Sequence, residues 1–209
     1  MKKLLHIIAT PRAKASRTLQ VTEAFLDSFR KKYPQCNIDT LNVFTENLPS
    51  LTVKMISGKY VLLGGGELSP DLKKAWKDIV SHIERFLSAD GYLISTPMWN
   101  FSIPYPLKQY IDIIVQPKYL FKYTEKGPEG LVKNRKLVII TSRGGDYGPE
   151  SPFHAFDYQE PYLRSILGFV GITDITFINA QPMDALGPDV QARKIEEAVV
   201  LARKAAEKI

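Results

Sequence analysis

Short apolar runs alternate along the chain with longer stretches in which apolar residues recur every three or four positions. A short apolar run bounded by polar residues is typical of a buried strand, and the longer period is typical of an amphipathic helix. This pattern predicts strands at Lys3 to Ala9, Asn37 to Val43, Gly91 to Thr96, Leu137 to Thr141 and Ile172 to Ile178. Strands that alternate with helices indicate βαβ units around a parallel sheet.

Several of the helical stretches present a clear apolar face. The first contains Thr22, Phe25, Leu26 and Phe29, and the last contains Ile195, Ala198, Val199, Ala202 and Ala206. A middle stretch repeats the spacing at Leu72, Trp76, Ile79, Val80, Ile83, Phe86 and Leu87. We predict that Ser69, followed by Pro70, caps the start of this middle helix. All these apolar positions are predicted to lie in the core.

The length and the number of strands suit one α/β domain. The chain has 209 residues, a size that such domains often reach, so we expect a single domain over residues 1–209. Five strands are the number found in the flavodoxin-like fold, which predicts a doubly wound parallel sheet of order 2-1-3-4-5 with helices on both faces. Ligands bind beyond the carboxyl ends of such strands. The loops after the first, third and fourth strands are therefore the candidate site.

One long connection does not fit this minimal pattern. Phe44 to Ser69 is long for a strand-to-helix connection and contains three consecutive glycines, Gly64 to Gly66. A glycine run of this kind could form a phosphate loop or belong to a mobile surface excursion. Because no Gly-Lys-Ser/Thr follows, we expect the excursion.

A second irregular region precedes the fourth predicted strand. Here Tyr119, Phe121 and Tyr123 alternate with other residues, and the run Gly127 to Gly130 follows. Alternation predicts a short strand with its three aromatic rings on one side. The glycine- and proline-containing run predicts a turn.

Composition and charge narrow the class of protein. Lys and Arg number 28 against 22 Asp and Glu, a net charge of +6 that favours anionic ligands. The basic residues are scattered, so we interpret them as solvated helix faces and expect no nucleic-acid binding. The lone Cys36 excludes an intramolecular disulfide and a multi-cysteine metal site, and it suits a reducing cytoplasm. The apolar run Leu4 to Ala9 is too short for a signal peptide, and no stretch is long enough to span a membrane.

The loop after the first strand has the chemistry of an anion site. Thr10 to Thr18 contains no G-x-G-x-x-G or Walker pattern. It does offer three hydroxyls, three cationic side chains and the N–H groups of a helix start, which together suit one phosphate group. The alternative is that Ser16 only caps the following helix.

The loops after the third and fourth strands are also unusual. Trp99 and Phe101 are large apolar residues in a connection that should face water, so we expect a flat aromatic cofactor or another subunit to cover them. The alternative is that both rings tuck into the core of the chain itself. Gly144 and Gly145 would let backbone N–H groups approach a ligand closely, although an ordinary turn is again the alternative.

Four stretches carry a resemblance to a known family. They are PMWNF (Pro97 to Phe101), FKYTEKGPEGLV (Phe121 to Val132), ITSRGG (Ile140 to Gly145) and PYLRSILGFVGITDI (Pro161 to Ile175). Over essentially its whole length the chain resembles the FMN-dependent NADH azoreductases, also described as FMN-dependent NADH:quinone oxidoreductases. The resemblance implies a flavodoxin-like homodimer with FMN bound tightly at the interface, one per subunit, and NADH or NADPH as electron donor.

The resemblance also implies which residues hold the cofactor. The phosphate should be held by Thr10, Ser16, Arg17 and Thr18, the flavin ring by Pro97, Met98, Trp99, Asn100 and Phe101, and its pyrimidine side by Ser142, Arg143, Gly144 and Gly145. Phe101, with Phe121 and Tyr123 from a neighbouring chain, should form the flat walls of the substrate pocket. The family often has a serine pair in the first loop and a tyrosine at the centre of the second, whereas this chain has Ala9 with Thr10, and Trp99. Threonine retains the hydroxyl, and tryptophan retains the aromatic face.

The implied function is reduction of quinones and aromatic azo compounds in a ping-pong cycle through flavin N5, which requires no catalytic side chain. The alternatives are a flavodoxin-type electron carrier, a class that is usually small and acidic, and a non-catalytic flavin-binding regulator. A hydrolase is disfavoured because Ser142 lacks a G-x-S-x-G elbow. We interpret His6 and His82 as structural, and a role of His154 in proton delivery is left open.

Overall fold

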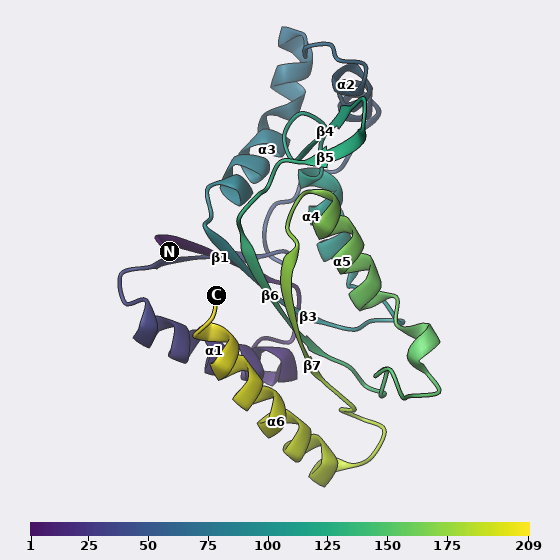
Figure 1. Cartoon of the computed structure of the whole chain (residues 1–209). Coiled ribbons are helices and arrows are strands. Elements are labelled where there is room, and N and C mark those ends of the chain that lie inside the picture. The colour runs from purple at the N-terminus through teal and green to yellow at the C-terminus, as the bar shows by residue number, and fades with distance from the viewer.

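A computed structural model describes residues 1–209, and a five-stranded parallel sheet runs through it (Figure 1). The strands are β1 (Lys3–Ile8), β2 (Asn37–Asn42), β3 (Gly91–Pro97), β6 (Lys136–Ser142) and β7 (Asp174–Ala180). Their order is β2-β1-β3-β6-β7, which confirms the predicted order 2-1-3-4-5 for the strands of this sheet. The last strand begins later than predicted because the N–H of Ile172 donates to the carbonyl of Leu167 and closes the preceding helix.

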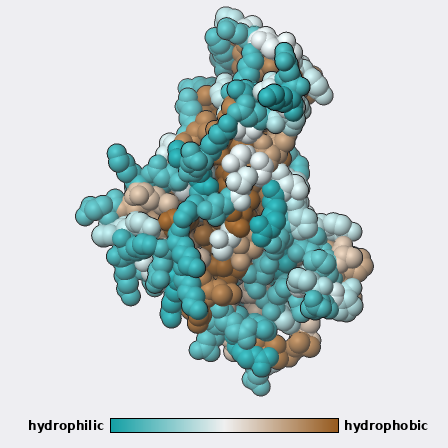
Figure 2. Space-filling model, in the orientation of Figure 1, coloured by the Kyte–Doolittle hydropathy of each residue, from teal (hydrophilic) through white to brown (hydrophobic).

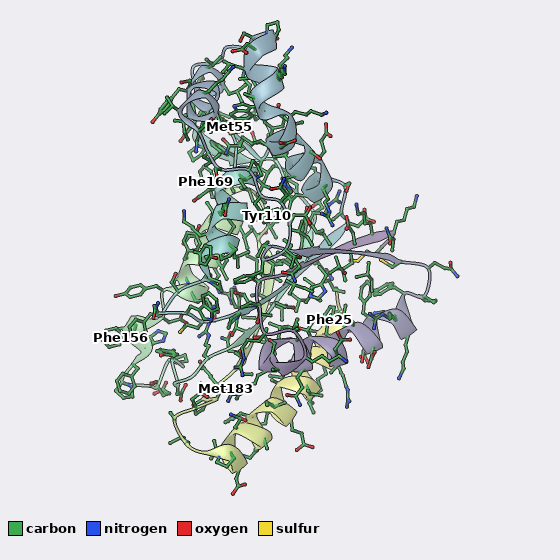
Figure 3. The ribbon with its side chains drawn as sticks, turned by 180° about the vertical axis from the view of Figure 1, so that it is seen from behind. Phe25, Met55, Tyr110, Phe156, Phe169 and Met183 are labelled. Carbon is green, nitrogen blue, oxygen red and sulfur yellow. The ribbon has the colours of Figure 1, made fainter.

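The helices pack against the sheet through two separate hydrophobic layers. They are α1 (Arg17–Lys32), α2 (Val53–Leu63), α3 (Pro70–Leu87), α4 (Tyr105–Ile114), α5 (Gln159–Phe169) and α6 (Pro188–Ala206). Leu4 and its neighbours in the sheet pack with α1 and α6, and Phe25 of α1 lies in this layer (Figure 3). The next residue, Leu5, faces the other layer with α3, α4 and α5. Side chains alternate across a strand, so one buried strand supplies both layers.

The predicted helix starts and apolar faces are largely present. Ser69 caps α3 by accepting a hydrogen bond at Oγ from the N–H of Leu72 at 3.3 Å, and Pro70 is the first helical residue, as predicted. Within this helix Trp76, Ile79 and Ile83 are buried. None of the helices combines the length and the hydropathy needed to cross a membrane.

The connection from Phe44 to Ser69 was predicted to be a surface excursion, and the structure adds a helix that the prediction did not include. It contains helix α2, of which only Gly58 and Leu62 are buried. The indole N–H of Trp76 donates to the carbonyl of Met55 at 3.0 Å, and a Cβ on Gly58 would lie 2.4 Å from Trp76 Nε1. Contact with α3 therefore holds this helix in place. The apolar residues of α2 form only a weak helical pattern, so the sequence of this segment alone does not predict the helix.

The second irregular region forms a hairpin, and here too the prediction needs correction. Strand β4 (Phe121–Thr124) pairs in antiparallel fashion with β5 (Gly127–Gly130), so the run predicted to be a turn is a strand. The proline in β5 is tolerated because each strand of a two-stranded sheet is an edge. Tyr119 lies outside β4, and its ring stacks on Trp76 with a centroid separation of 6.3 Å. Of the three rings, only those of Phe121 and Tyr123 lie on one side of the strand, and their centroids are 5.8 Å apart.

Candidate functional site

The predicted loops meet at the carboxyl ends of the central strands. Pro97 at the end of β3 is level with Ser142 at the end of β6, which is level with Ala180 at the end of β7. The strand pairing continues into the loops, where the N–H of Met98 donates to the carbonyl of Ser142 at 2.9 Å. The chain adds β2 on one side of β1 and then β3 on the other, so the strand order reverses between β1 and β3. Such a switch point leaves a crevice for a ligand.

A cavity of about 220 Å³ occupies this position. Its lining is mostly polar and comprises Thr10, Arg12, Ser16, Arg17, Pro97, Met98, Trp99, Ser142, Arg143, Gly144, Met183 and Asp184. Nine of these twelve were predicted as cofactor-binding residues; the other three are Arg12, Met183 and Asp184. In Figure 3 Met183 lies near the start of α1. The four other predicted cofactor-binding residues, which do not line the cavity, are Thr18, Asn100, Phe101 and Gly145.

The start of α1 supplies the anion-binding groups of this cavity. Ser16 caps the helix by accepting at Oγ from the N–H of Leu19 at 3.3 Å, so the capping role weighed for it is real. Its hydroxyl proton is still available to a ligand, because capping uses only the oxygen as an acceptor. The N–H groups of Arg17 and Thr18 have no intrahelical acceptor at a helix start. The helix dipole and the Arg17 guanidinium add positive charge at the same point.

A buried chain of hydrogen bonds ties the strands to this helix. His6 Nε2 lies 2.9 Å from Ser95 Oγ, which lies 2.8 Å from Thr22 Oγ1. Thr22 donates to the carbonyl of Thr18, so Ser95 must donate to Thr22 and His6 must donate through Nε2. Thr18 Oγ1 lies 2.7 Å from Ser142 Oγ. The Thr18 side chain is thus committed inside the protein, and it can serve a ligand only through its backbone.

Burial sets the protonation state of His6, the histidine in this hydrogen-bonded network. His6 is 3 % exposed. Burial, and secondarily the positive charge of Arg30, lowers the pKa of His6 to about 4. The ring is therefore neutral near pH 7, in agreement with the Nε2–H form that the hydrogen bonds require. His6 is a structural residue, as predicted from its place inside a strand.

The loop after β3 presents its aromatic rings outward. Trp99 is 36 % exposed and Phe101 44 % exposed, so neither is packed away in the core. Asn100 and Phe101 have φ values of +46° and +69°, a left-handed conformation that is unusual for residues other than glycine. Mutual hydrogen bonds between the backbones of Trp99 and Ser102 close this tight turn. Strained backbone of this kind concentrates at ligand sites.

Trp99 separates the polar cavity from a larger hollow. This second space, of about 840 Å³, is lined by residues that include Leu51, Trp99, Asn100, Tyr105 and Tyr162. Tyr105 is 72 % exposed. The polar cavity therefore opens beside a space with aromatic and aliphatic side chains in its lining, large enough for a planar ring system. Elsewhere, where β6 and β7 run through the middle of the view, Figure 2 shows hydrophobic residues framed by mostly hydrophilic ones.

Arg143 was predicted to face the cofactor, but its side chain turns into the protein. It is 1 % exposed, and Nη1 donates to Asp157 Oδ2 at 2.8 Å. Its Nε donates to Gln159 Oε1 at 3.1 Å, and Gln159 Nε2 donates to the carbonyl of Pro97 at 2.8 Å. Its Nη2 is buried without a hydrogen-bond partner, 3.7 Å from Glu160 Oε2, so only this nitrogen and the backbone of Arg143 are left to serve a ligand. The side chain instead joins the loop after β6 to the loop after β3 and to the start of α5.

The two glycines after Arg143 keep backbone donors exposed. No hydrogen bond within the chain uses the N–H of Gly144 or Gly145. A Cβ on Gly144 would lie 3.1 Å from Asp184 Oδ2, and one on Gly145 would lie 3.3 Å from the Tyr147 hydroxyl. Side chains at these positions would narrow the site, so glycine keeps it open.

The predicted walls from the hairpin lie elsewhere on the chain. Phe121 is 5 % exposed and packs on Phe169, with ring centroids 4.7 Å apart, whereas Tyr123 is 63 % exposed. Figure 1 places the hairpin with α2 and α3, away from the carboxyl ends of the strands. Neither ring lines the polar cavity. Within one chain the hairpin and the cavity are therefore not brought together.

A different aromatic group surrounds Phe101. Its ring lies 5.3 Å from that of Phe156 and 6.2 Å from that of Tyr147, measured between centroids. Phe156 belongs to an outlying segment at the edge of the molecule (Figure 3). The neighbouring His154 bonds through Nδ1 to the carbonyl of Tyr147 at 3.0 Å and does not line the polar cavity. His154 thus holds this segment in shape, and a catalytic role for it stays a prediction.

Comparison with known proteins agrees with this geometry. The family model described as a flavodoxin-like fold matches residues 2–205. An FMN-dependent NADH:quinone oxidoreductase of Nitratidesulfovibrio vulgaris (strain DP4) is 40% identical over 206 residues, covering 99% of each chain. A protein of the same name from Ruegeria pomeroyi is 38% identical and covers 92% of this chain and 94% of its own.

Two solved structures that resemble this chain over nearly its whole length are azoreductases. The crystal structure of an azoreductase from Bacillus anthracis str. Sterne has a TM-score of 0.90 and 31% identity, covering 100% of both chains. An FMN-dependent NADH-azoreductase from Bacillus anthracis str. Ames Ancestor, solved in complex with FMN, has a TM-score of 0.85 and 30% identity, covering 99% of this chain and 100% of its own.

The chain belongs to the FMN-dependent NADH:quinone oxidoreductase family. In this oxidoreductase the polar cavity also has an acidic residue at its mouth, Asp184, which sequence reasoning missed. Asp184 follows β7, whereas the candidate site was predicted in the loops after the first, third and fourth strands of the sheet. The sequence did contain a signal for this residue: the fifth parallel strand was predicted, and its carboxyl end must lie at the same edge of the sheet as those of the other strands.

Proposed function

We propose that this protein is an FMN-dependent oxidoreductase that uses NADH or NADPH to reduce quinones and aromatic azo compounds. As a member of its family the protein is an oxidoreductase enzyme that depends on FMN. One observation carries the assignment of the site. The loops after β1, β3 and β6 converge on a polar cavity at the switch point of the sheet, with exposed aromatic rings at its edge.

The donor groups of this cavity fit the two ends of FMN. A phosphate would be held by the Ser16 hydroxyl, the Arg17 guanidinium and the first N–H groups of α1, a combination that suits an anion. The flavin ring would lie against Pro97 to Phe101, and the open space at Gly144 and Gly145 would take its pyrimidine side. We assign these roles to the single domain of residues 1–209.

The side chains around the cavity bind and orient rather than react. When bound, FMN supplies two-electron chemistry at its N5 atom, and one pocket used in turn by NADH and the acceptor gives ping-pong kinetics. The unpaired N–H groups of Gly144 and Gly145 stabilise negative charge at the pyrimidine edge. Trp99 and Phe101 provide apolar faces against which an aromatic acceptor stacks.

We further propose a homodimer in which each site is completed by its partner. Trp99 and Tyr105 flank a hollow of about 840 Å³ beside the polar cavity, and exposed aromatic surface of this kind marks an interaction site. Tyr123 is exposed on the hairpin and could reach a site only on another subunit. We assign it, with the hairpin that Phe121 anchors, to the second wall over the flavin.

The experiment that tests the function is anaerobic reduction of the purified yellow protein. Rapid bleaching by NADH, followed by recovery of colour on addition of a quinone, supports the enzyme. A flavodoxin-type carrier would bleach only with a reducing partner protein, and a regulator would not turn over at all. Protein that fails to bind FMN, or that FMN colours but NADH does not bleach, contradicts the proposal.

A further inference from the structure

Arg17, the cation proposed to hold the phosphate, already has an anionic partner in the structure. Its Nη1 lies 2.5 Å from Asp184 Oδ1, and both residues line the polar cavity. The side chains are 28% and 64% exposed, respectively. The pair thus closes across the mouth of the cavity rather than being buried in its wall.

The backbone, rather than the ion pair, fixes the position of Asp184. The N–H groups of Met183, Asp184 and Ala185 all donate to the carbonyl of Gly144, at 3.1, 2.9 and 3.2 Å. Loss of the carboxylate charge would therefore leave the loop after β7 in place. Its negative charge, in contrast, has no hydrogen-bond partner other than Arg17. Because the backbone holds the loop and the carboxylate contacts only Arg17, a single substitution can remove the charge without moving the loop.

An ion pair this exposed yields readily to a stronger ligand for the guanidinium. Exposed pairs contribute little stability because water screens them. A phosphate carries a larger negative charge than a carboxylate and offers three acceptor oxygens to the fork of an arginine. The phosphate would need to take Arg17 from Asp184 and then remain close to that carboxylate. Both effects oppose binding of the phosphate.

We infer that Asp184 is a counter-charge that competes with the phosphate of FMN for Arg17 and so lowers the affinity of this chain for its cofactor. The inference rests on the proposed function, because it takes the cavity to be the FMN site. It assigns to the loop after β7 a role in setting how tightly the cofactor is held. The role depends on charge and not on the shape of the loop.

The test compares FMN with riboflavin, which lacks the phosphate, in binding to the apoprotein. Asp184→Asn keeps the size of the side chain and removes its charge. We expect this variant to bind FMN about three- to tenfold more tightly than the wild type, with riboflavin affinity unchanged, and the gain to shrink in high salt because screening weakens charge effects. Flavin fluorescence quenching measures both dissociation constants without any turnover.

Two further variants separate this effect from general changes in charge. Glu197→Gln removes an exposed carboxylate on α6 that pairs with Arg193 and Lys194, and it should leave both affinities unchanged. Arg17→Gln should weaken FMN binding, and adding Asp184→Asn to it should then produce a smaller gain than in the wild type, because only the direct repulsion between the carboxylate and the phosphate is left to remove. An Asp184→Asn protein that binds FMN no more tightly, or that gains equally for riboflavin, overturns the inference while the proposed function stands. Wild-type apoprotein that takes up no FMN overturns both.

Discussion

The buried histidine of β1 makes stability depend on pH in a way that can be worked out from the structure. His6 is 3 % exposed, and its pKa is lowered to about 4 from an ordinary value of 6.5, first by burial and then by Arg30. The unfolded chain therefore binds a proton that the folded chain rejects as the pH falls below 6.5. The stability contributed by neutral His6 is present above that value and is lost progressively down to about pH 4. Between pH 7 and pH 5 this linkage amounts to about 2 kcal/mol, and its limit is about 3 kcal/mol.

Urea unfolding of the apoprotein at a series of pH values between 7 and 4.5 measures this loss. His6→Gln is the matched control, because glutamine can donate to Ser95 and does not titrate. Other groups titrate in both proteins and cancel in the difference, so the comparison uses the change in stability with pH and not its absolute value. The reasoning is refuted if the wild type and His6→Gln lose stability in parallel over this range.

Three other substitutions test the site and its supports. Gly144→Val should weaken FMN binding about tenfold by filling space beside Asp184, as judged by flavin retained after gel filtration, whereas Gly168→Ala, where a Cβ meets nothing within 4 Å, should retain it. Asp157→Ala should destabilise the fold by about 3–5 kcal/mol in urea unfolding, because it removes the near partner of the buried Arg143 and leaves only Glu160, 3.7 Å from Nη2, while the exposed Glu150→Ala should change little. Tyr123→Ala should raise the KM for aromatic quinones about three- to tenfold with flavin content unchanged, and an unchanged KM would remove Tyr123 from the pocket.

The hairpin shows why structure changes the choice of variant. Alternation along residues 119–123 indicates correctly that Phe121 and Tyr123 share a side, but it does not say what covers that side. In the structure Phe121 packs on Phe169 in the core. Replacing it with alanine would cost about 3–5 kcal/mol through the cavity left behind, and any kinetic effect would be confounded by loss of stability. The exposed Tyr123 is the usable probe.

The sheet and the principal helices could be predicted because their signals are local and repeated. Five short apolar runs and strongly periodic helices such as α3 carry their own evidence, as does the cap at Ser69. Helix α2 carries little, because it buries only Gly58 and Leu62 and is held by Trp76, which comes later in the chain. The run in β5 contains glycine and proline, which favour turns locally, but pairing with β4 outweighs that preference.

In the site, too, the sequence predicts where residues lie better than it predicts which distant residues they contact. The motif residues were correctly located at the carboxyl ends of the strands, because a parallel sheet brings those ends together whatever the side chains do. Which atoms of each residue face the cavity is decided by distant partners. Arg143 looks like a cation available to a ligand until Asp157, fourteen residues later, binds its guanidinium inside the protein. Arg17 remains at the cavity, but the residue that shares its charge follows β7, 167 positions along the chain. A motif therefore predicts that a residue lies near the ligand, whereas the charge that the ligand meets depends on ion pairs that only the folded chain forms.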